Sequence, residues 1–177
     1  MGSLRLRFTA ADAQAPVANY ERTLDLADAI ARISYMQEGV KFTREAFVSQ
    51  PDEALLLRLS ADRPGRISFD ARLERPERSS VSTAAGGLEL RGQLNDGRQG
   101  DQGVRFAARL AVRNTGGTVT VEGDVVRVRN ANEVVLLVTA ATDIKSFAGR
   151  KVEDARSAAA ADLRAVAAWD YAAARRE

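Results

Sequence analysis

With neither histidine nor cysteine in the sequence, only carboxylates, Lys, Tyr or hydroxyl groups could do chemistry, and carboxylates are the obvious candidates. Ser-His nucleophiles, thiolates and structural zinc sites therefore cannot be built from it. Paired Asp and Glu residues can act together as general acid and base. The candidates lie mostly at expected turns or on polar strand faces: Asp25, Asp28, Glu45, Asp52, Glu53, Asp70, Glu74 and Asp143. Their scatter favours solvated charges and turn-forming residues over a catalytic pair.

Arg44 and Glu45 are the exception, because they lie where the alternation of apolar residues slips. Val40 and Phe42 share one strand parity, whereas Phe47 has the other. A β-bulge near Arg44 would account for this slip. We expect a structural ion pair at this position rather than a catalytic role.

The sequence contains only weak matches to other ligand-binding motifs. Gly86-Gly87 and Gly116-Gly117 do not lead from a strand into a helix as phosphate-binding loops do, so we expect hairpin turns there. Asn130, Asn132 and Asp143 offer oxygen ligands, but their spacing differs from that of a calcium-binding loop. The sequence therefore predicts no catalytic residue, no cofactor and no metal site.

A sugar-binding surface would need exposed aromatic rings. Three phenylalanines have the apolar parity of their strands, which predicts core positions: Phe8, Phe69 and Phe106. Tyr20, Tyr35 and Phe147 remain for a direct sugar contact. These are few for a binding platform.

Length and charge limit the classes of protein to which this chain could belong. A chain of 177 residues suits one domain that buries roughly 70% of its unfolded surface. The 26 basic and 24 acidic residues give no clustered basic surface, which disfavours nucleic acid as a partner. No apolar run approaches the roughly 20 residues of a membrane-spanning helix, and the N-terminus lacks a signal-peptide pattern. We expect a soluble domain of undetermined compartment, and a secreted or periplasmic parent protein is compatible with this.

The elements that would position these residues are strands. Alternation with a period of two recurs from about residue 4 to residue 143, and Ile67–Leu73 and Val104–Val112 are clear cases with one buried and one wet face. Residues 54–59 and 134–139 are apolar on both faces, which predicts central strands covered on both sides. With turns at short intervals, we predict about ten or eleven strands in antiparallel sheets packed face to face.

The pattern changes after residue 151. Four apolar residues follow Val152 at helical spacing: Ala155, Ala159, Leu163 and Val166. The prediction is an all-β fold, an antiparallel β-sandwich of the super-sandwich type over residues 4–147, followed by a C-terminal α-helix over residues 152–177. Trp169 and Tyr171 lie on this helix, where they would dock against the sandwich or against another domain.

A series of short segments resembles glycoside hydrolase family 95, the α-L-fucosidases, in its N-terminal β-sandwich. The run from Tyr20 to Leu26 matches the pattern Y-x-R-x-L-D-L. The resemblance continues in order through these segments: Ala29–Tyr35, Gly39–Phe47, Ser49, Pro51-Asp52, Arg58–Ala61, Ser79–Val81, Gly103–Phe106 and Leu136–Thr142. No single segment is diagnostic, but their order and spacing together cover nearly the whole chain.

The resemblance implies a fold and a role. Members of this family hydrolyse α-linked L-fucose with inversion, and their catalytic Glu, Asp and Asn residues lie in an (α/α)6 barrel that follows the sandwich. None of those positions exists in this chain, which we therefore expect to be inactive alone. The resemblance also implies that early strands of the sandwich are missing and that the helix leads toward the barrel, with Val152, Leu163 and Val166 as its docking stripe.

The expected function is thus the non-catalytic sandwich portion of an α-L-fucosidase-like hydrolase. The alternative is a free-standing carbohydrate-binding or structural β-sandwich module. The expected partners are the catalytic barrel of the parent protein and, in the parent, an oligosaccharide. If early strands are missing, exposed sheet edges and apolar faces would also favour self-association.

Overall fold

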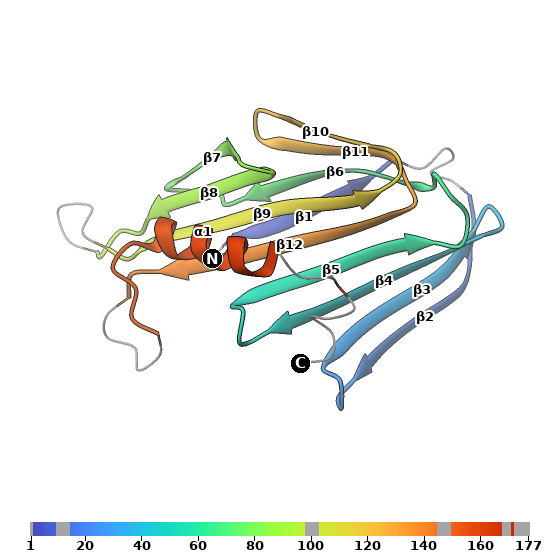
Figure 1. The fold of residues 1–177 in the computed structure, drawn as a ribbon, viewed down its shortest axis with the longest axis horizontal. Coiled ribbons are helices and arrows are strands. Elements are labelled where there is room, and N and C mark those ends of the chain that lie inside the picture. The colour runs from blue at the N-terminus through green and yellow to red at the C-terminus, as the bar shows by residue number, and fades with distance from the viewer. Residues whose placement is uncertain (1, 10–14, 98–102, 145–149, 168–170, 172–177) are drawn as a thin grey trace.

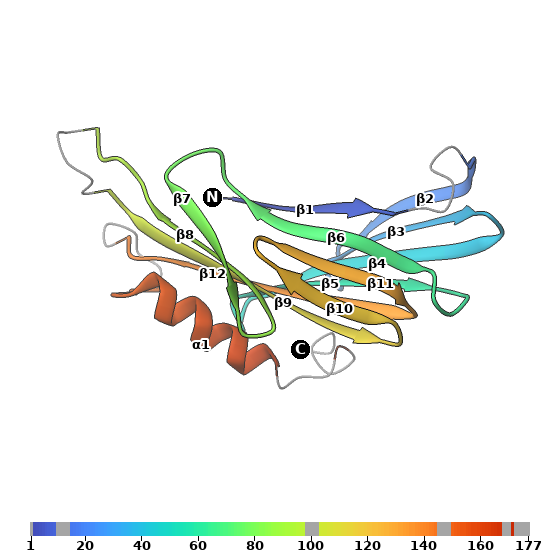
Figure 2. The same cartoon turned by 90° about the horizontal axis from the view of Figure 1, so that it is seen from above.

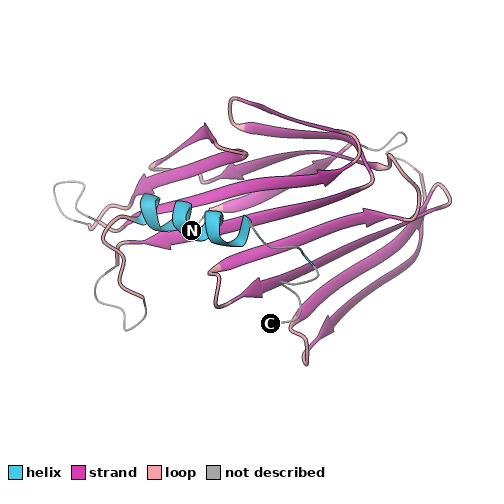
Figure 3. Cartoon of the chain, viewed as in Figure 1, coloured by secondary structure: helices cyan, strands magenta, loops and turns pink. Residues whose placement is uncertain are grey.

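The computed structural model contains two antiparallel sheets and one helix (Figures 1 and 3). It describes residues 2–9, 15–97, 103–144, 150–167 and 171. The smaller sheet has the strand order β1 (Ser3–Phe8), β6 (Ile67–Glu74), β11 (Val125–Ala131) and β10 (Thr118–Glu122). The larger sheet has the order β2 (Val17–Asp25), β3 (Ile30–Gln37), β4 (Val40–Ser49), β5 (Ala54–Ala61), β12 (Glu133–Thr142), β9 (Arg105–Thr115), β8 (Gly87–Gln93) and β7 (Ser79–Ala84).

The predicted all-β sandwich with a C-terminal helix is confirmed. The described residues form twelve strands, slightly more than the ten or eleven expected. In this part of the chain, no helix is both long and apolar enough to cross a membrane.

The two sheets enclose the main core. We call the face of the larger sheet that is turned toward the smaller sheet its inner face, and the opposite one its outer face. On β12, Leu136 belongs to the core between the sheets, whereas its neighbour Leu137 belongs to a second cluster on the outer face. Both are almost fully buried. Strands β5 and β12 are therefore covered on both sides, as their continuous apolar sequences predict.

The helix α1 (Ala155–Ala167) covers the outer face. It packs on β12, β9 and β5 (Figures 1 and 2). Its buried residues are Ala155, Ala159, Leu163 and Val166, which is the stripe predicted from the sequence. Val152 lies ahead of the described helix, and Trp169 is outside the described residues. The sequence predicts that one side of β9 is exposed to solvent. Helix α1 covers part of that side, so the Arg109 side chain is only 16% exposed.

The predicted bulge near Arg44 is wrong. Strand β4 pairs with β3 and with β5 in continuous register. The parity slips because the covered face changes along the strand: Phe42 packs into the core between the sheets, whereas Phe47 packs into the outer cluster. Register shifts occur instead in β2 and β11, next to Asn19 and Asn130, which both have positive φ. Asn tolerates that backbone conformation better than most residues.

The two glycine pairs have different roles. Gly86-Gly87 lies in the hairpin between β7 and β8, as predicted. A side chain at Gly87 would collide with the carbonyl oxygen of Leu110 on β9. Gly116-Gly117 does not form a hairpin, because β9 and β10 belong to different sheets. Both glycines have positive φ, and they carry the chain from one sheet to the other.

The smaller sheet covers only part of the larger one. Strands β2 and β3 extend beyond it (Figure 1). Strand β4 lies at its border, since Phe42 packs into the core whereas Val48 is exposed. We call β2, β3 and β4 the wing. All nine residues of β2 are exposed. The wing is the one large departure from an evenly layered sandwich in the described part of the chain.

Candidate functional site

Two buried carboxylates lie on the outer face of the larger sheet. Glu45 on β4 is 4% exposed and Glu89 on β8 is 1% exposed. A buried carboxylate is costly unless cations or hydrogen-bond donors neutralise it. These two groups are therefore the first places to look for chemistry.

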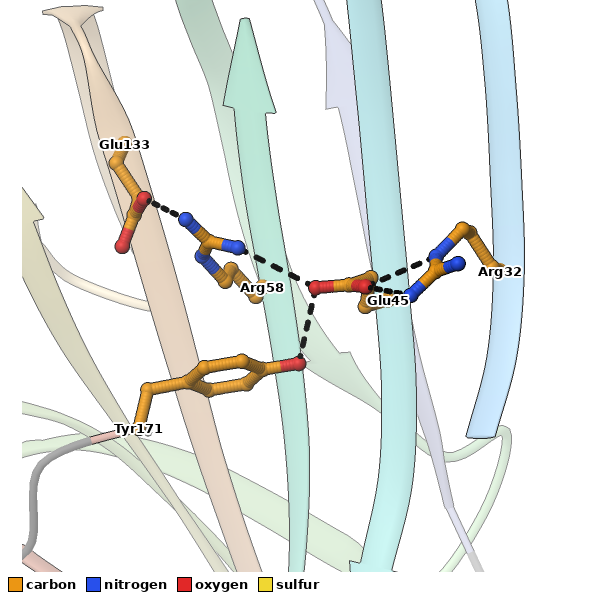
Figure 4. A network of polar contacts seen from close by, with 5 residues as sticks. All are labelled: Arg32, Glu45, Arg58, Glu133 and Tyr171. Carbon is orange, nitrogen blue, oxygen red and sulfur yellow. Dashed lines mark hydrogen bonds and ion pairs between the residues drawn. The ribbon is translucent and has the colours of Figure 1, made fainter. Parts of the chain in front are cut away.

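Glu45 lies in a network of arginines (Figure 4). Antiparallel pairing places Arg32 of β3 and Arg58 of β5 directly opposite Glu45. Arg32 donates through Nε and one terminal nitrogen to Oε1 of Glu45 at 2.9 and 2.6 Å. Arg58 donates to Oε2 at 3.3 Å, and the Tyr171 hydroxyl lies 3.4 Å from the same oxygen. The carboxylate is thus held from both sides.

Arg58 joins this network to Glu133 of β12. Its guanidinium donates to Glu133 Oε2 at 2.5 Å. The hydrogen bond to Glu133 raises the pKa of Arg58 above its ordinary value, although desolvation acts in the opposite direction. The ring of Tyr171 lies 5.3 Å from the Arg58 guanidinium and packs edge-on against Phe47. The network therefore fixes Tyr171 onto the sheet.

Glu89 is held in a similar way. Strand pairing places it opposite Arg109 of β9, with which it forms an ion pair. Arg156 of α1 donates through Nε to Oε2 of Glu89 at 2.9 Å. This hydrogen bond raises the pKa of Arg156. Glu89 thus connects β8, β9 and α1.

Two further polar contacts attach the helix. The buried Thr139 hydroxyl of β12 donates to the backbone carbonyl of Ala159 at 2.7 Å. Arg150, ahead of α1, donates to both carboxylate oxygens of Asp162 at 2.9 and 3.0 Å. The hydrogen bond to Asp162 raises the pKa of Arg150. We call this set of outer-face contacts, around Glu45, Glu89, Thr139 and Asp162, the helix-docking face.

The structure does not place a general acid and a general base so that both could act on one substrate bond. Glu45 and Glu89 lie on strands separated by four steps of the sheet, which is roughly 19 Å at about 4.8 Å per step. Hydrolytic carboxylate pairs lie about 5 to 10 Å apart. Glu45 and Glu133 are closer, but the Arg58 guanidinium occupies the space between them. The arrangement can orient and hold a helix, and it leaves no room for a substrate between the carboxylates.

The expected ion pair between Arg44 and Glu45 does not form, because the two side chains point to opposite faces of β4. Arg44 lies on the inner face, where its guanidinium is 4.0 Å from the centre of the Phe8 ring and donates to the Tyr35 hydroxyl at 2.9 Å. Tyr35 also stacks on Phe42. Glu45 is a structural group as expected, with partners on neighbouring strands.

Several of the other candidate carboxylates lie in turns. Asp25 accepts hydrogen bonds from the N–H groups of Ala27 and Asp28 at 2.9 and 3.2 Å, which closes a turn. Asp52 and Glu53 lie in the turn between β4 and β5. These are turn-forming positions, in line with the interpretation of their sequence.

Strand carboxylates of the smaller sheet form ion pairs near the surface. Asp70 pairs with Arg129 and Glu74 with Arg5, both at 2.7 Å. These residues lie outside the helix-docking face, and each carboxylate has its own cation.

The oxygen-rich residues considered for calcium also have separate roles. Asn132 accepts a hydrogen bond from the N–H of Gly65 at 2.7 Å, and Asp143 accepts one from Arg105 at 2.8 Å. They lie at opposite ends of β12. The described residues contain no group of three or more Asp or Glu side chains that could hold a metal ion.

The sequence did not predict the contacts that Glu89 makes with Arg109 and Arg156. Glu89 lies between Leu88 and Leu90 in a strand whose alternation is regular. Nothing local distinguishes it from a solvated charge. The pairing of β8 with β9 would have identified it, because that register places an acid opposite a base.

Cavities provide no better site. The largest described cavity, about 640 Å³, opens at one end of the sandwich. Its lining is mostly aliphatic and includes Leu55, Leu73, Leu90 and Val138. Such a surface offers few partners for the hydroxyl groups of a sugar. Of the aromatic residues considered for sugar contact, Tyr20 is 60% exposed, Tyr35 is engaged with Phe42, and Phe147 is outside the described residues.

Known proteins resemble this chain in sequence or in fold. The chain is 30% identical over 165 residues to alpha-L-fucosidase 2 of Arabidopsis thaliana, a match that covers 81% of this chain and 19% of that protein. This confirms the resemblance to α-L-fucosidases. A putative kojibiose phosphorylase from the human microbiome has the same fold, with a TM-score of 0.66 at 11% identity over 97% of this chain and 26% of that one.

The chain thus spans about a fifth to a quarter of the length of these proteins. Residues 1–146 match the family model for the N-terminal domain of glycosyl hydrolase family 65. That range contains both sheets described above. The chain belongs to this family of glycoside hydrolase N-terminal domains.

Proposed function

We propose that this chain is the non-catalytic β-sandwich portion of an α-L-fucosidase-like hydrolase of glycoside hydrolase family 95. In this proposal a helical barrel outside the chain hydrolyses α-L-fucosyl linkages with inversion. The family match and the similarity to a fucosidase support the proposal. The helix-docking face supports it further, because that face holds a helix in place.

The observation that carries the proposal is the state of the two buried carboxylates. Glu45 and Glu89 are each bound by two arginines and lie too far apart to act on one bond. Their role is to attach α1 and Tyr171 to the sheet. A domain built in this way supports and orients the polypeptide that follows its helix.

The direct test is an assay for released L-fucose. The purified chain is incubated with an aryl α-L-fucoside and with a fucosylated oligosaccharide. We expect no release above the buffer control, and the same result for Glu45→Gln and Glu89→Gln. Turnover by the purified chain that one of these substitutions abolishes would overturn the proposal.

The alternative, a free-standing carbohydrate-binding module, is tested by calorimetry with the same oligosaccharide. We expect no binding heat, because Tyr20 and Phe8 are the exposed aromatic residues in the described part of the chain and they do not form a platform. The reading frame around the encoding gene is a second test. A region with the helical repeats of a barrel after the codon for Glu177 is expected, and a frame without one would favour the alternative.

A further inference from the structure

The inner face of the wing carries exposed apolar side chains. Cross-strand register places Leu24 of β2 opposite Ala31, and Val48 of β4 opposite Leu55, all on the inner face. Leu24 is 63% exposed and Val48 is 67% exposed. Val17 at the start of β2 and Phe8 on the adjacent strand β1 are also exposed. Arg22, opposite Ile33, lies on the same face between Val17 and Leu24. Exposed apolar side chains bordered by polar ones mark interaction sites.

Two free sheet edges border this face. In the described residues, β1 pairs only with β6 and β2 pairs only with β3. Each edge therefore presents unpaired backbone groups, which can pair with another strand. The uncovered face and the edge of β1 lie side by side, since Phe8 of β1 contacts Arg44 of β4.

We propose that the wing is a dimerisation surface, and that its occupant is the wing of a second copy of this chain. The two inner faces stack, and β1 of each copy pairs with β2 of the other. The inference goes beyond the proposed function and does not depend on it. One two-fold axis parallel to the strands generates this arrangement and closes it.

Strand direction fits this pairing. The arrows of β1 and β2 point in opposite directions in Figure 1. A two-fold rotation about an axis along the strands keeps each direction, so β1 meets the partner's β2 as an antiparallel neighbour. Antiparallel pairing is the more favourable type.

The charges of the two edges are complementary. On β1, Arg5 and Arg7 alternate with the core residues and point away from the core. On β2, Glu21 and Asp25 lie on the outer face. In the dimer these outward sides of β1 and of the partner's β2 are adjacent. Arg5 already pairs with Glu74 of β6, so Arg7 is the cation that faces the acidic edge. Opposite charges across strands favour such a pair.

Pairing of β1 with a second β1 is excluded by the shape of the molecule. The required axis would be perpendicular to the sheets. It would place both wings in one layer beneath the joined smaller sheets, where they would overlap. Pairing of β1 with β2 keeps the wings in different layers.

The area fits a weak, reversible dimer. Strands β2 to β4 have eight to ten residues each. At about 4.8 Å between strands and about 3.3 Å per residue, they present roughly 430 Å² of flat sheet. Two copies therefore contribute roughly 860 Å² before the edges are counted, which is the size of a transient interface.

Sedimentation velocity over a wide concentration range tests the proposal. We expect a reversible dimer that Leu24→Lys shifts to monomer, because a charge would be buried between the stacked faces. The matched control is Thr120→Lys on the exposed face of β10, which lies away from the wing and from the edges of β1 and β2 and should leave the dimer intact. Circular dichroism should show that both variants stay folded, since both side chains are exposed in one copy.

Exchanging the charges of the two strand edges tests whether β1 pairs with the partner's β2. Arg7→Glu and Glu21→Arg should each weaken the dimer severalfold, and the double variant should restore it. A wild-type chain that stays monomeric at all concentrations would overturn the proposal, as would a dimer unaffected by Leu24→Lys.

Discussion

Strand β12 and strand β2 belong to the same sheet but have different surroundings. On β12 both faces are buried, one by the smaller sheet and the other by α1. On β2 every residue is exposed. Both strands form antiparallel ladders with their neighbours, so backbone pairing alone does not explain the difference. What distinguishes the two regions is the layer that lies over each.

The two regions also differ in how they use polar groups. The covered half buries Glu89 and Thr139, and each has a partner on another element. The inner face of the wing instead leaves apolar side chains at the surface, as at Leu24. The covered half is complete within one copy, whereas the wing has the properties of a surface made for contact.

A matched pair of leucine truncations is expected to give the largest difference between these regions. Leu136 and Leu24 both lie on the inner face of the larger sheet, but Leu136 is fully buried. Leu136→Ala should lower the free energy of unfolding by about 2 to 5 kcal/mol, because it leaves a cavity. Leu24→Ala should change it by less than about 0.5 kcal/mol in dilute solution. Urea denaturation measures both, and similar losses would remove the distinction.

Loss of the buried carboxylate should have the next largest effect. Glu89→Gln leaves Arg109 without its anionic partner in a site that is largely buried. We expect a loss of about 3 kcal/mol. The control is Asp70→Asn, which removes an ion pair with both side chains about one third exposed and should cost less than about 1 kcal/mol. An equal loss for both variants would show that Glu89 is not a special attachment point.

The hydroxyl that anchors the helix should contribute less. Thr139→Val keeps the shape of the side chain but removes the hydrogen bond to Ala159. We expect a loss of about 1 kcal/mol, since the carbonyl of Ala159 loses a buried donor. Thr120→Val on the exposed face of β10 is the matched control and should be nearly neutral. Thermal unfolding of the three proteins provides the comparison.

A pH dependence at the start of α1 should be the smallest effect. Asp154 Oδ1 accepts a hydrogen bond from the Ser157 N–H at 2.7 Å, which caps the helix. This bond lowers the pKa of Asp154 below its ordinary value of 3.8. A carboxylate with a lowered pKa stabilises the folded state above the unfolded-state value, and the contribution is lost as the pH falls through the folded-state pKa.

Asp154→Asn tests this effect because Asn also caps helices but does not titrate. Acid unfolding followed by circular dichroism should show that the wild type loses more stability below about pH 4 than the variant does. Identical acid profiles would contradict a role for the Asp154 charge.

The sequence predicted strands such as β6 and β9 well because each carries its own alternation. The continuous apolar stretch of β12 also predicts burial on both faces. The slip in β4 was misinterpreted, since a change in the covering layer and a bulge produce the same parity pattern. Sequence shows which side chains are apolar but not which layer lies opposite them.

The helix-docking face was harder to predict. Ala159, Leu163 and Val166 could be predicted because helical spacing places them on one side. The link between Glu89 and Arg156 joins residues 67 positions apart, and it depends on where α1 crosses the sheet. Gly116-Gly117 was misassigned for a similar reason, because a glycine turn looks the same whether the chain stays in its sheet or leaves it.

Hydrogen exchange of the wild-type chain at low and high concentration tests the contrast between the two regions most directly. Amides of β12 should be strongly protected at both concentrations, because both faces of that strand are buried in one copy. Amides of β1 and β2 should exchange quickly when dilute and slowly when concentrated. Equal exchange of β1 and β2 at both concentrations would contradict the assignment of the wing as a contact surface.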